Sequence, residues 1–554
     1  MRGRQVFMES LALHDCDRIF GNPGTTENPL LESLLEYPDV EYIVALHEGV
    51  AVCSAGFYAQ ATGRTPLANV HVAPGLGNAI GMMYGCFKAR VPVVITAGQQ
   101  DTRMRLRDPL LRHDLVEMAK PVVKWAVEPQ SADEIGPIMR RAFQIANQHP
   151  KGPVFVALPN NVMEQETDVQ ASAAGSLSAP LAPDESVLTA IATKLIAAAH
   201  PAICVGDDVA VDHAINEFLT LTKTLGAAVY TDFLLARKPI ASDHSNYVRA
   251  LATDAAQNRA MLADHDVIVL LGGVTMEEIW YETGSALPDD AYVYQIEADS
   301  SLLSKHRPVN EGISGDLKTL LKFLNQAILA QNNDATEERQ ADNNAKLKAS
   351  QADKLASQTA RFDQQQGLLP MAVSEAVSVL AGILPNNIVI VDESITASAD
   401  VDRAFRGINP ADFFAGRGGG IGQGIAGALG TAVAMPDRPI IALSGDGSAM
   451  YSIQALWTAA HHDLNILFVI LANAEYRVLK HNLDIHRQRF DAPSDQPYPH
   501  MDLTNPLLGF AEIALGMGVQ GSVAVTPEEV AAGAQQYLHQ SGPYLLELKI
   551  EGKG

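Results

Sequence analysis

The chain has 554 residues, with 40 Lys and Arg against 64 Asp and Glu, so its formal net charge at pH 7 is −24. A chain this acidic lacks the clustered positive charge that nucleic-acid phosphates require, so we expect no nucleic-acid partner. Hydrophobic residues make up 47% of the sequence and charged residues 19%, which excludes a wholly disordered chain and predicts about three to four domains with large cores.

The cysteines and the apolar segments limit the cellular setting. Cys16, Cys53, Cys86 and Cys204 are scattered and lie in or beside apolar runs, which predicts buried free thiols rather than disulfides or a zinc site. No signal peptide is visible, and no apolar stretch approaches the ~20 residues of a membrane span. We therefore expect a cytoplasmic protein that has no membrane partner.

Short β-rich runs alternate with longer Ala- and Leu-rich stretches along the chain, which is typical of parallel sheets covered by helices. The alternation falls into three blocks, and we expect each block to be a doubly wound α/β domain. The predicted strands are 42–46, 67–72, 91–97 and 153–158 in the first block, 202–205, 228–231, 267–271 and 293–296 in the second, and 388–391, 440–443, 466–471 and 545–550 in the last.

Two polar segments divide these blocks. A Pro- and Ala-rich stretch at about 167–185 predicts a first linker. Residues 331–366 are rich in Ala, Gln, Asn, Lys and Asp, which predicts either a solvated helical linker or a mobile connection. The expected parts of the chain are an N-terminal domain at 1–170, a central domain at 186–330, the linker at 331–366 and a C-terminal domain at 367–554.

The most informative motif lies in segment 440–476. One predicted strand ends in Ser-Gly-Asp-Gly-Ser, a helix follows, and a second strand ends just before Asn473. Neighbouring parallel strands would bring Asp446 and Asn473 to the same edge of a sheet, although 27 positions separate them. Their oxygens suit Mg²⁺, and the N–H groups of Gly447 and Ser448 at a helix start suit a diphosphate. Gly-Asp-Gly alone is typical of an ordinary loop, whereas the whole spacing predicts a metal–diphosphate site.

This motif resembles the signature of the thiamin diphosphate-dependent enzymes, which begins with Gly-Asp-Gly and ends in Asn. The resemblance implies that Mg²⁺ is held by Asp446, the Asn473 side chain and the backbone carbonyl of Glu475. It also implies that the glycine-rich segment 417–422 grips the aminopyrimidine ring and that segment 393–396 contacts the diphosphate and the substrate. Without the resemblance, the first segment would be interpreted as a flexible loop and the second as an ordinary polar turn. The implied cofactor contacts are Glu48, Ile395, Thr396, Gly419, Ile421, Gly445, Gly447, Ser448, Asn473 and Tyr476.

Glu48 and His71 follow two predicted strands of the N-terminal domain. Without the resemblance, Glu48 would be interpreted as a carboxylate at a helix start and His71 as a core histidine with satisfied hydrogen bonds. In the family a glutamate, here Glu48, acts on N1′ of the aminopyrimidine. A backbone carbonyl, here that of Gly419, faces the 4′-amino group, and a bulky residue, here Ile421, bends the cofactor. The likeness is densest to the benzoylformate decarboxylase branch, which implies that His71 handles protons during decarboxylation and that Thr25 lies near the substrate carboxylate.

The likeness to that branch extends from about residue 7 to residue 547, with one departure that bears on the substrate. The branch has a second pocket histidine on its middle domain, where this sequence has Ile279, and one aromatic pocket residue is replaced by Asn482. Either another group such as His113 or His481 takes over proton transfer, or the substrate differs; both histidines are also consistent with ordinary loop positions. The expected substrate pocket comprises Thr25, Leu110, Leu111, Ile279, Val478 and Leu479.

We therefore expect a thiamin diphosphate- and Mg²⁺-dependent carboxy-lyase that converts a benzoylformate-like 2-oxo acid, aromatic or branched, to an aldehyde and CO₂ without oxidation. In this family the glutamate of one subunit meets the metal site of another, which implies a homodimer or homotetramer with its sites at the subunit interface. Three alternatives are a carboligase similar to acetolactate synthase, a more distant decarboxylase of the oxalyl-coenzyme A type, and a non-catalytic cofactor-binding protein.

Overall fold

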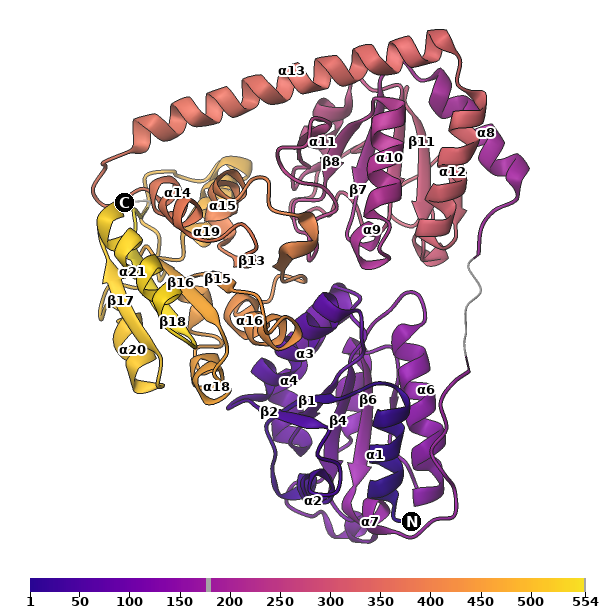
Figure 1. Cartoon of the computed structure of the whole chain (residues 1–554), viewed down its shortest axis with the longest axis vertical. Coiled ribbons are helices and arrows are strands. Elements are labelled where there is room, and N and C mark those ends of the chain that lie inside the picture. Colours follow the sequence, from indigo (N-terminus) through magenta and orange to yellow (C-terminus); the bar gives the residue numbers. More distant parts are fainter. Residues whose placement is uncertain (176–180, 553–554) are drawn as a thin grey trace. The chain divides into compact units, whose positions relative to one another are not determined.

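A computed structural model describes residues 1–175 and 181–552 of the chain (Figure 1). The described residues form three parallel six-stranded sheets flanked by helices, which confirms the predicted fold class. The chain divides into two compact units: residues 1–176, 365–405 and 414–554 hold the first and third sheets, and residues 177–364 and 406–413 hold the second. Residues 176–180, inside the first predicted linker, and residues 553–554 lie outside the described part.

The N-terminal domain contains the first sheet, whose strand order is β2-β1-β3-β4-β6-β5. Its strands are β1 (Arg18–Gly21), β2 (Glu41–Val44), β3 (Leu67–Val70), β4 (Val94–Gln99), β5 (Ala126–Val127) and β6 (Val154–Pro159). Its helices are α1 (Gly3–Leu13), α2 (Asn28–Leu34), α3 (Glu48–Thr62), α4 (Val72–Lys88), α5 (Leu115–Ala119), α6 (Ile135–Asn147) and α7 (Asn160–Glu164). Phe7 of α1 and Met139 of α6 pack with Val94 and Val154 of the sheet in one buried cluster.

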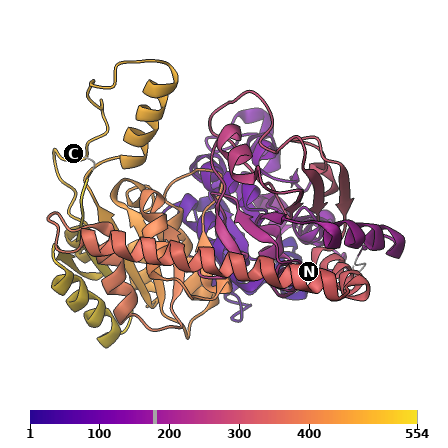
Figure 2. The same cartoon turned by 90° about the horizontal axis from the view of Figure 1, so that it is seen from above.

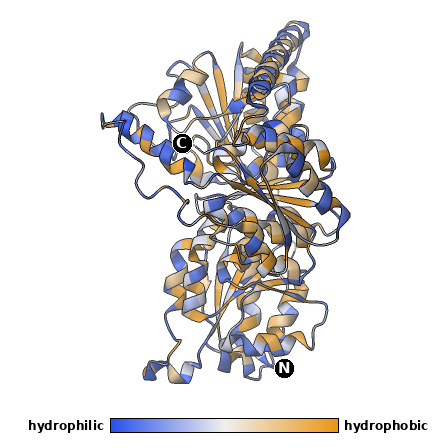
Figure 3. Ribbon diagram, turned by 90° about the vertical axis from the view of Figure 1, so that its left-hand side faces the viewer, coloured by the Kyte–Doolittle hydropathy of each residue, from blue (hydrophilic) through white to orange (hydrophobic). Residues whose placement is uncertain are grey.

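The central domain contains the second sheet, with strand order β12-β11-β10-β7-β8-β9. Its strands are β7 (Pro201–Val205), β8 (Ala228–Thr231), β9 (Tyr247–Ala250), β10 (Val267–Leu271), β11 (Tyr292–Glu297) and β12 (Glu311–Ser314), and its helices are α8 (Glu185–Ala197), α9 (Asp208–Val211), α10 (Ile215–Leu225), α11 (Ala255–Leu262) and α12 (Leu317–Gln331). Along β10, Val267 and Val269 enter one buried cluster whereas Ile268 and Leu270 enter another. Helices therefore cover both faces, which explains the continuous apolar runs of these strands (Figure 3).

The C-terminal domain contains the third sheet, with strand order β14-β13-β15-β16-β18-β17. Its strands are β13 (Val389–Glu393), β14 (Phe413–Ala415), β15 (Ile440–Gly445), β16 (Ile466–Ala472), β17 (Gln520–Ala524) and β18 (Tyr544–Lys549). Its helices are α14 (Val373–Ile383), α15 (Ser398–Ala404), α16 (Gln423–Ala434), α17 (Asp446–Ala449), α18 (Ala455–His461), α19 (Arg477–Arg489), α20 (Phe510–Gly516) and α21 (Pro527–His539).

The N-terminal and C-terminal domains pack together through α3 and α16, within one compact unit. The Ser54 hydroxyl donates to the Ala426 carbonyl at 2.8 Å. A Cβ placed on Gly430 would lie 1.8 Å from the Ser54 carbonyl oxygen, and one on Gly427 would lie 2.7 Å from the Phe57 ring. Two glycines of α16 thus allow a contact that any larger residue would block.

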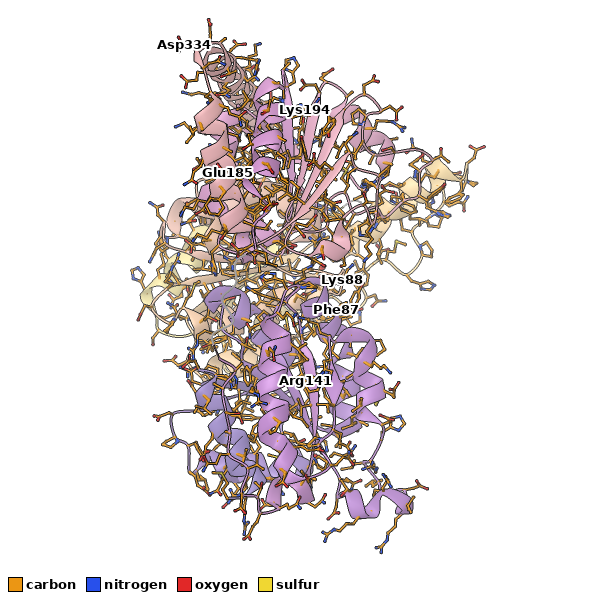
Figure 4. The ribbon with its side chains drawn as sticks, turned by 90° about the vertical axis from the view of Figure 1, so that its right-hand side faces the viewer. Phe87, Lys88, Arg141, Glu185, Lys194 and Asp334 are labelled. Atoms are coloured by element: carbon orange, nitrogen blue, oxygen red, sulfur yellow. The ribbon has the colours of Figure 1, made fainter. Side chains whose placement is uncertain are left out.

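The segment expected to be a linker contains one helix of 32 residues, α13 (Asp334–Gln365), whose first residue is labelled in Figure 4. Its buried side chains are mainly amides rather than apolar groups. Asn343 donates to the Ala199 carbonyl at 2.9 Å, and Gln351 donates to the Ser242 carbonyl at 2.6 Å. These hydrogen bonds attach α13 to the central domain, which explains how a helix with few apolar residues is held in place.

The four cysteines are buried and free, as their apolar surroundings predict. Burial raises the pKa of the Cys16 and Cys86 thiols to about 12, so both stay protonated and unreactive near neutral pH. Over residues 1–175 and 181–552, none of the helices combines the length and the apolar character that crossing a bilayer requires.

Candidate functional site

Two strands of the third sheet end side by side at the predicted metal–diphosphate motif. β15 pairs in parallel with β16, and Asp446 follows β15 as the first residue of α17. One carboxylate oxygen of Asp446 accepts from the Gly447 N–H at 2.7 Å, and the other accepts from the Ala474 N–H at 2.7 Å. The structure therefore brings Asp446 to the turn that carries Asn473, as the sequence predicts.

Asp446 is a buried carboxylate, 4% exposed, at the end of β15. Burial raises its pKa above the ordinary value, while the N–H groups of Gly447 and Ala474 act in the opposite direction. The described residues, 1–175 and 181–552, contain no group of three or more His, Cys, Asp or Glu side chains placed to hold a metal. The predicted set needs only one carboxylate, together with an amide oxygen and a carbonyl, and this composition is typical of Mg²⁺ sites in which phosphates and waters supply the remaining ligands.

The turn after β16 has a shape that leaves room at the end of β15. Ala474 adopts a left-handed φ of 56°, and the Asn473 side chain accepts from the Glu475 N–H at 3.1 Å. The Tyr476 ring lies so close to Gly447 that a Cβ there would come within 2.4 Å of it, whereas a Cβ on Gly445 would meet no atom within 4 Å. Open space therefore adjoins the strand end, and the residues around it fit a metal-bound diphosphate.

The glycine-rich loop before α16 is braced by one glutamine. The side-chain amide of Gln423 donates to the Arg417 carbonyl at 3.0 Å and to the Gly420 carbonyl at 2.6 Å. Gly418 lies against Tyr84 and Lys88, which are near the end of α4 (Figure 4 labels Lys88). The loop is thus held in a defined shape, although four of the six residues from 417 to 422 are glycine.

Glu393, the last residue of β13, closes the start of α16. One of its carboxylate oxygens accepts from the N–H groups of Gly422 and Gln423 at 2.8 and 3.0 Å, and the other accepts from Gly424 N–H at 2.9 Å and from the Ser444 hydroxyl at 3.3 Å. Burial raises the pKa of Glu393 to about 7 against the opposing effect of these donors. Glu393 therefore joins the glycine-rich loop to the strand that leads to Asp446.

Glu48 is the first residue of α3 and is 5% exposed. Its carboxylate accepts from the Asn78 side-chain amide of α4 at 3.0 Å, and a Cβ on Gly75 would lie 2.6 Å from its other oxygen. His47, the residue before it, accepts from the Gly49 N–H and caps the helix. Glu48 is therefore a carboxylate at a helix start. One of its oxygens faces Gly75, which has no side chain to cover that oxygen.

His71 stands directly after β3 at the N-cap position of α4, where its side chain makes no capping hydrogen bond and instead contacts the buried Glu27. Its Nδ1 lies 2.8 Å from a carboxylate oxygen of Glu27 and 3.2 Å from the Thr26 hydroxyl. The same carboxylate accepts from the N–H groups of Gly24 and Gly98, both at 2.8 Å. Because a carboxylate accepts from the Nδ1–H group, Nε2 is the ring nitrogen left to exchange a proton.

The remaining predicted residues lie mostly at the surface of the chain. Thr25, in the 3-10 helix η1 (Thr25–Glu27), is exposed, and its neighbour Thr26 is the buried threonine that contacts His71. Leu110 is 93% exposed, and Leu479 of α19 is 45% exposed. The other predicted pocket, loop and cofactor residues that are exposed or half-buried are Leu111, His113, Ile279, Ile395, Thr396, Gly419, Ile421, Val478, His481 and Asn482.

Sequence reasoning missed Glu27, Asn78 and Gln423. Glu27 stands beside Thr26 in a short turn, yet its partners come from positions 24, 71 and 98, so only the folded sheet brings them together. Asn78 follows the Pro-Gly-Leu-Gly segment after β3. Asn78 could have been found because it is a polar residue within the first two turns of a helix that starts at a strand end.

Candidate site residues therefore lie at strand ends of the first and third parallel sheets, and matches to family models show which class of protein this is. Residues 1–118 match the N-terminal TPP binding domain of the thiamine pyrophosphate enzymes, residues 188–324 match their central domain, and residues 397–548 match their C-terminal TPP binding domain. The chain belongs to the thiamine pyrophosphate enzyme family, which confirms the resemblance stated from its motifs.

Individual relatives cover almost the whole chain. Benzoylformate decarboxylase of Pseudomonas aeruginosa is 28% identical over 546 residues, with 98% of each chain covered. The acetolactate synthase isozyme 2 large subunit of Escherichia coli K12 is 25% identical over 564 residues, with 100% of this chain and 96% of that protein covered.

Solved structures are similar along their whole length as well. A candidate thiamin diphosphate-dependent enzyme from Mycobacterium smegmatis has a TM-score of 0.86 at 30% identity, and each chain is fully covered. The thiamine diphosphate-dependent 4-hydroxybenzoylformate decarboxylase of Rhodococcus jostii RHA1 has a TM-score of 0.87 at 25% identity, with 100% of this chain and 99% of that chain covered.

Proposed function

We propose that the chain is a non-oxidative, thiamin diphosphate- and Mg²⁺-dependent decarboxylase that converts a benzoylformate-like 2-oxo acid, aromatic or branched, to an aldehyde and CO₂. The observation that carries this proposal is the pairing of His71 with the buried Glu27, 2.8 Å apart at a strand end of the N-terminal domain. A histidine held in one tautomer by a carboxylate suits proton transfer, which this reaction needs when the aldehyde forms.

The residues that would hold the cofactor are those whose surroundings fit it. Asp446, the Asn473 amide oxygen and the Glu475 carbonyl would bind Mg²⁺, and the N–H groups at the start of α17 would face the diphosphate. When bound, thiamin diphosphate supplies a carbon nucleophile for the ketone of the 2-oxo acid and accepts the electrons that CO₂ leaves behind. Glu48 would hold or release a proton at the aminopyrimidine, and His71 Nε2 would supply one to the product.

We also propose that two or more copies of the chain form the complete site, as a homodimer or homotetramer. Leu110 and Leu479, both predicted pocket residues, are 93% and 45% exposed on the single chain. Exposed leucines at a predicted apolar pocket are consistent with a site that a second copy completes. An apolar lining would favour loss of the charged carboxylate and would suit an aromatic or branched side chain.

A carboligase similar to acetolactate synthase is the second candidate. Ile279 stands where the benzoylformate decarboxylase branch has a pocket histidine, and acetolactate synthase subunits are among the relatives at similar identity. A site that lacks one proton-donating side chain would supply a proton to the product more slowly, which would favour reaction with a second carbonyl compound.

Product analysis with a panel of 2-oxo acids tests the two candidates. Benzoylformate, pyruvate and branched-chain acids would each be incubated with the full chain, thiamin diphosphate and Mg²⁺, and CO₂, aldehyde and hydroxyketone would be measured. Equal amounts of CO₂ and aldehyde support the decarboxylase. A hydroxyketone as the main product supports the carboligase, and no CO₂ together with no cofactor binding in calorimetry supports a protein without this activity.

A matched pair of variants tests the assignment of Glu48. Glu48→Gln should lower CO₂ release by at least about 100-fold, because an amide cannot exchange the proton that general acid–base catalysis requires. Glu41→Gln alters an exposed carboxylate on β2, the preceding strand, and should leave the rate unchanged. Full activity in Glu48→Gln would contradict the proposed role.

A further inference from the structure

A buried ion pair lies in the turn that carries two of the proposed metal ligands. Lys480 of α19 is 5% exposed and Glu475 is 6% exposed, and the ammonium group of Lys480 pairs with the Glu475 carboxylate. Lys480 also pairs with Asp502 at 2.7 Å, and Arg477 Nε lies 3.4 Å from the other Glu475 oxygen. A buried charge is costly unless it is paired, so these contacts restrict where the Glu475 side chain can lie.

The same turn is attached to a second segment through its backbone. The Tyr476 N–H donates to the Met501 carbonyl at 2.8 Å, and the Leu503 N–H donates to the Ala474 carbonyl at 2.7 Å. Lys480 binds Asp502, the residue between these two contacts. One lysine thus connects the turn to the segment that runs beside it, after the chain has passed through α19 and the loop that follows (amber in Figure 2).

We propose that Lys480 is a positioning residue for the divalent metal: by pairing with Glu475 and Asp502, it fixes the turn whose Glu475 carbonyl would bind the ion. The proposal rests on the metal site of the proposed function. A backbone carbonyl is a neutral ligand, and its contribution depends on groups that hold it in the right orientation. In this arrangement the Glu475 carboxylate binds Lys480 and holds the turn in place, while the Glu475 carbonyl is the group that would bind the metal.

The test measures metal-dependent cofactor binding rather than turnover. Thiamin diphosphate would be titrated calorimetrically into the full chain at a series of Mg²⁺ concentrations, and bound Mn²⁺ would be followed by electron paramagnetic resonance. Lys480→Met should raise the Mg²⁺ concentration for half-maximal binding by about 10- to 100-fold, the range expected when a group that orients a metal ligand is lost. Binding should recover at saturating Mg²⁺, and Lys480→Arg should restore the wild-type requirement.

Arg487→Met is the matched control. Arg487 is also buried on α19 and also lies against the Tyr498 ring, at 5.0 Å compared with 5.5 Å for Lys480. Its partners are the Pro497 carbonyl at 2.7 Å and Asp484 at 3.8 Å, so its loss should loosen the loop without changing the Mg²⁺ requirement.

Three results would overturn the proposal. They are an unchanged Mg²⁺ requirement in Lys480→Met, an equal increase in Arg487→Met, and binding by Lys480→Met that does not recover at saturating Mg²⁺. The assay contains no 2-oxo acid, so it can succeed even if the products show that the chain is not a decarboxylase. Failure of the positioning role and failure of the proposed function are therefore separate results.

Discussion

Ionisation of Glu393 is expected to make the stability of the chain depend on pH. The carboxylate is buried and accepts from three backbone N–H groups and one hydroxyl, yet its pKa is raised to about 7 from the ordinary 4.5. Between about pH 4.5 and pH 7, Glu393 keeps a proton in the folded chain that it has released in the unfolded chain. The stability that this group contributes is therefore fully present below about pH 4.5 and is lost as the pH rises through about 7.

The size of the effect follows from the two pKa values. A tenfold change in a protonation equilibrium corresponds to about 1.4 kcal/mol, so the interval from 4.5 to about 7 corresponds to a loss of about 3 kcal/mol. The proton is best accommodated on the oxygen that faces Ser444, because a hydroxyl can accept a hydrogen bond as well as donate one.

Glu393→Gln removes this ionisation and keeps one oxygen acceptor for the start of α16. The wild-type chain and the variant would be unfolded with urea at pH 5 to 8 without cofactor, and tryptophan fluorescence would be recorded. The stability of the wild type relative to the variant should fall by about 2 to 3 kcal/mol between these pH values. Glu528→Gln, at an exposed glutamate in the first turn of α21, serves as the control and should show a constant difference. A constant difference for Glu393→Gln as well would refute the reasoning.

Two further changes test the role proposed for His71 and the contact between the N-terminal and C-terminal domains. Glu27→Gln places an amide against His71 Nδ1 and should lower the rate of CO₂ release by about 100-fold and alter its pH profile, whereas an unchanged profile would show that Glu27 does not set the tautomer. Gly430→Ala puts a Cβ against the Ser54 carbonyl and should destabilise the chain by about 1 to 3 kcal/mol in thermal unfolding. Gly382→Ala, in a helix position with open space around it, should instead stabilise by about 0.5 to 1 kcal/mol; equal effects of the two alanines would contradict the packing argument.

The sequence predicted the central strands of the sheets but not most of their edges. Strands such as β10 and β16 are buried along their whole length, so they are continuous apolar runs. The edge strands β9, β12 and β17 are largely half-buried or exposed, and their polar residues hide them in the sequence. β1 (Arg18–Gly21) was also missed although it is internal, because its apolar run is only Ile19 and Phe20 and a Gly-Asn-Pro-Gly turn follows directly.

One part of the candidate site was predictable from the sequence, because neighbouring parallel strands end at the same edge of a sheet. Asp446 and the Asn473 turn were expected together because both follow neighbouring strands, and the structure joins them through the Ala474 N–H. The threonine beside His71 was not predictable, because the short 3-10 helix turns Thr26 inward and leaves Thr25 exposed. The roles of these residues in binding and catalysis stay predictions that the variants above address.

The contact between α3 and α16 has a consequence for synthesis of the chain. Ser54 and Ala426 are 372 positions apart, so the apolar face of α3 is made long before the helix that covers it. At about 5 to 20 residues per second, roughly 20 to 75 s separate the two on the ribosome. The central domain is completed within this interval, whereas the N-terminal domain must wait with its α3 face uncovered. We expect nascent chains that end before α16 to bind chaperones through this face and full-length chains to be released.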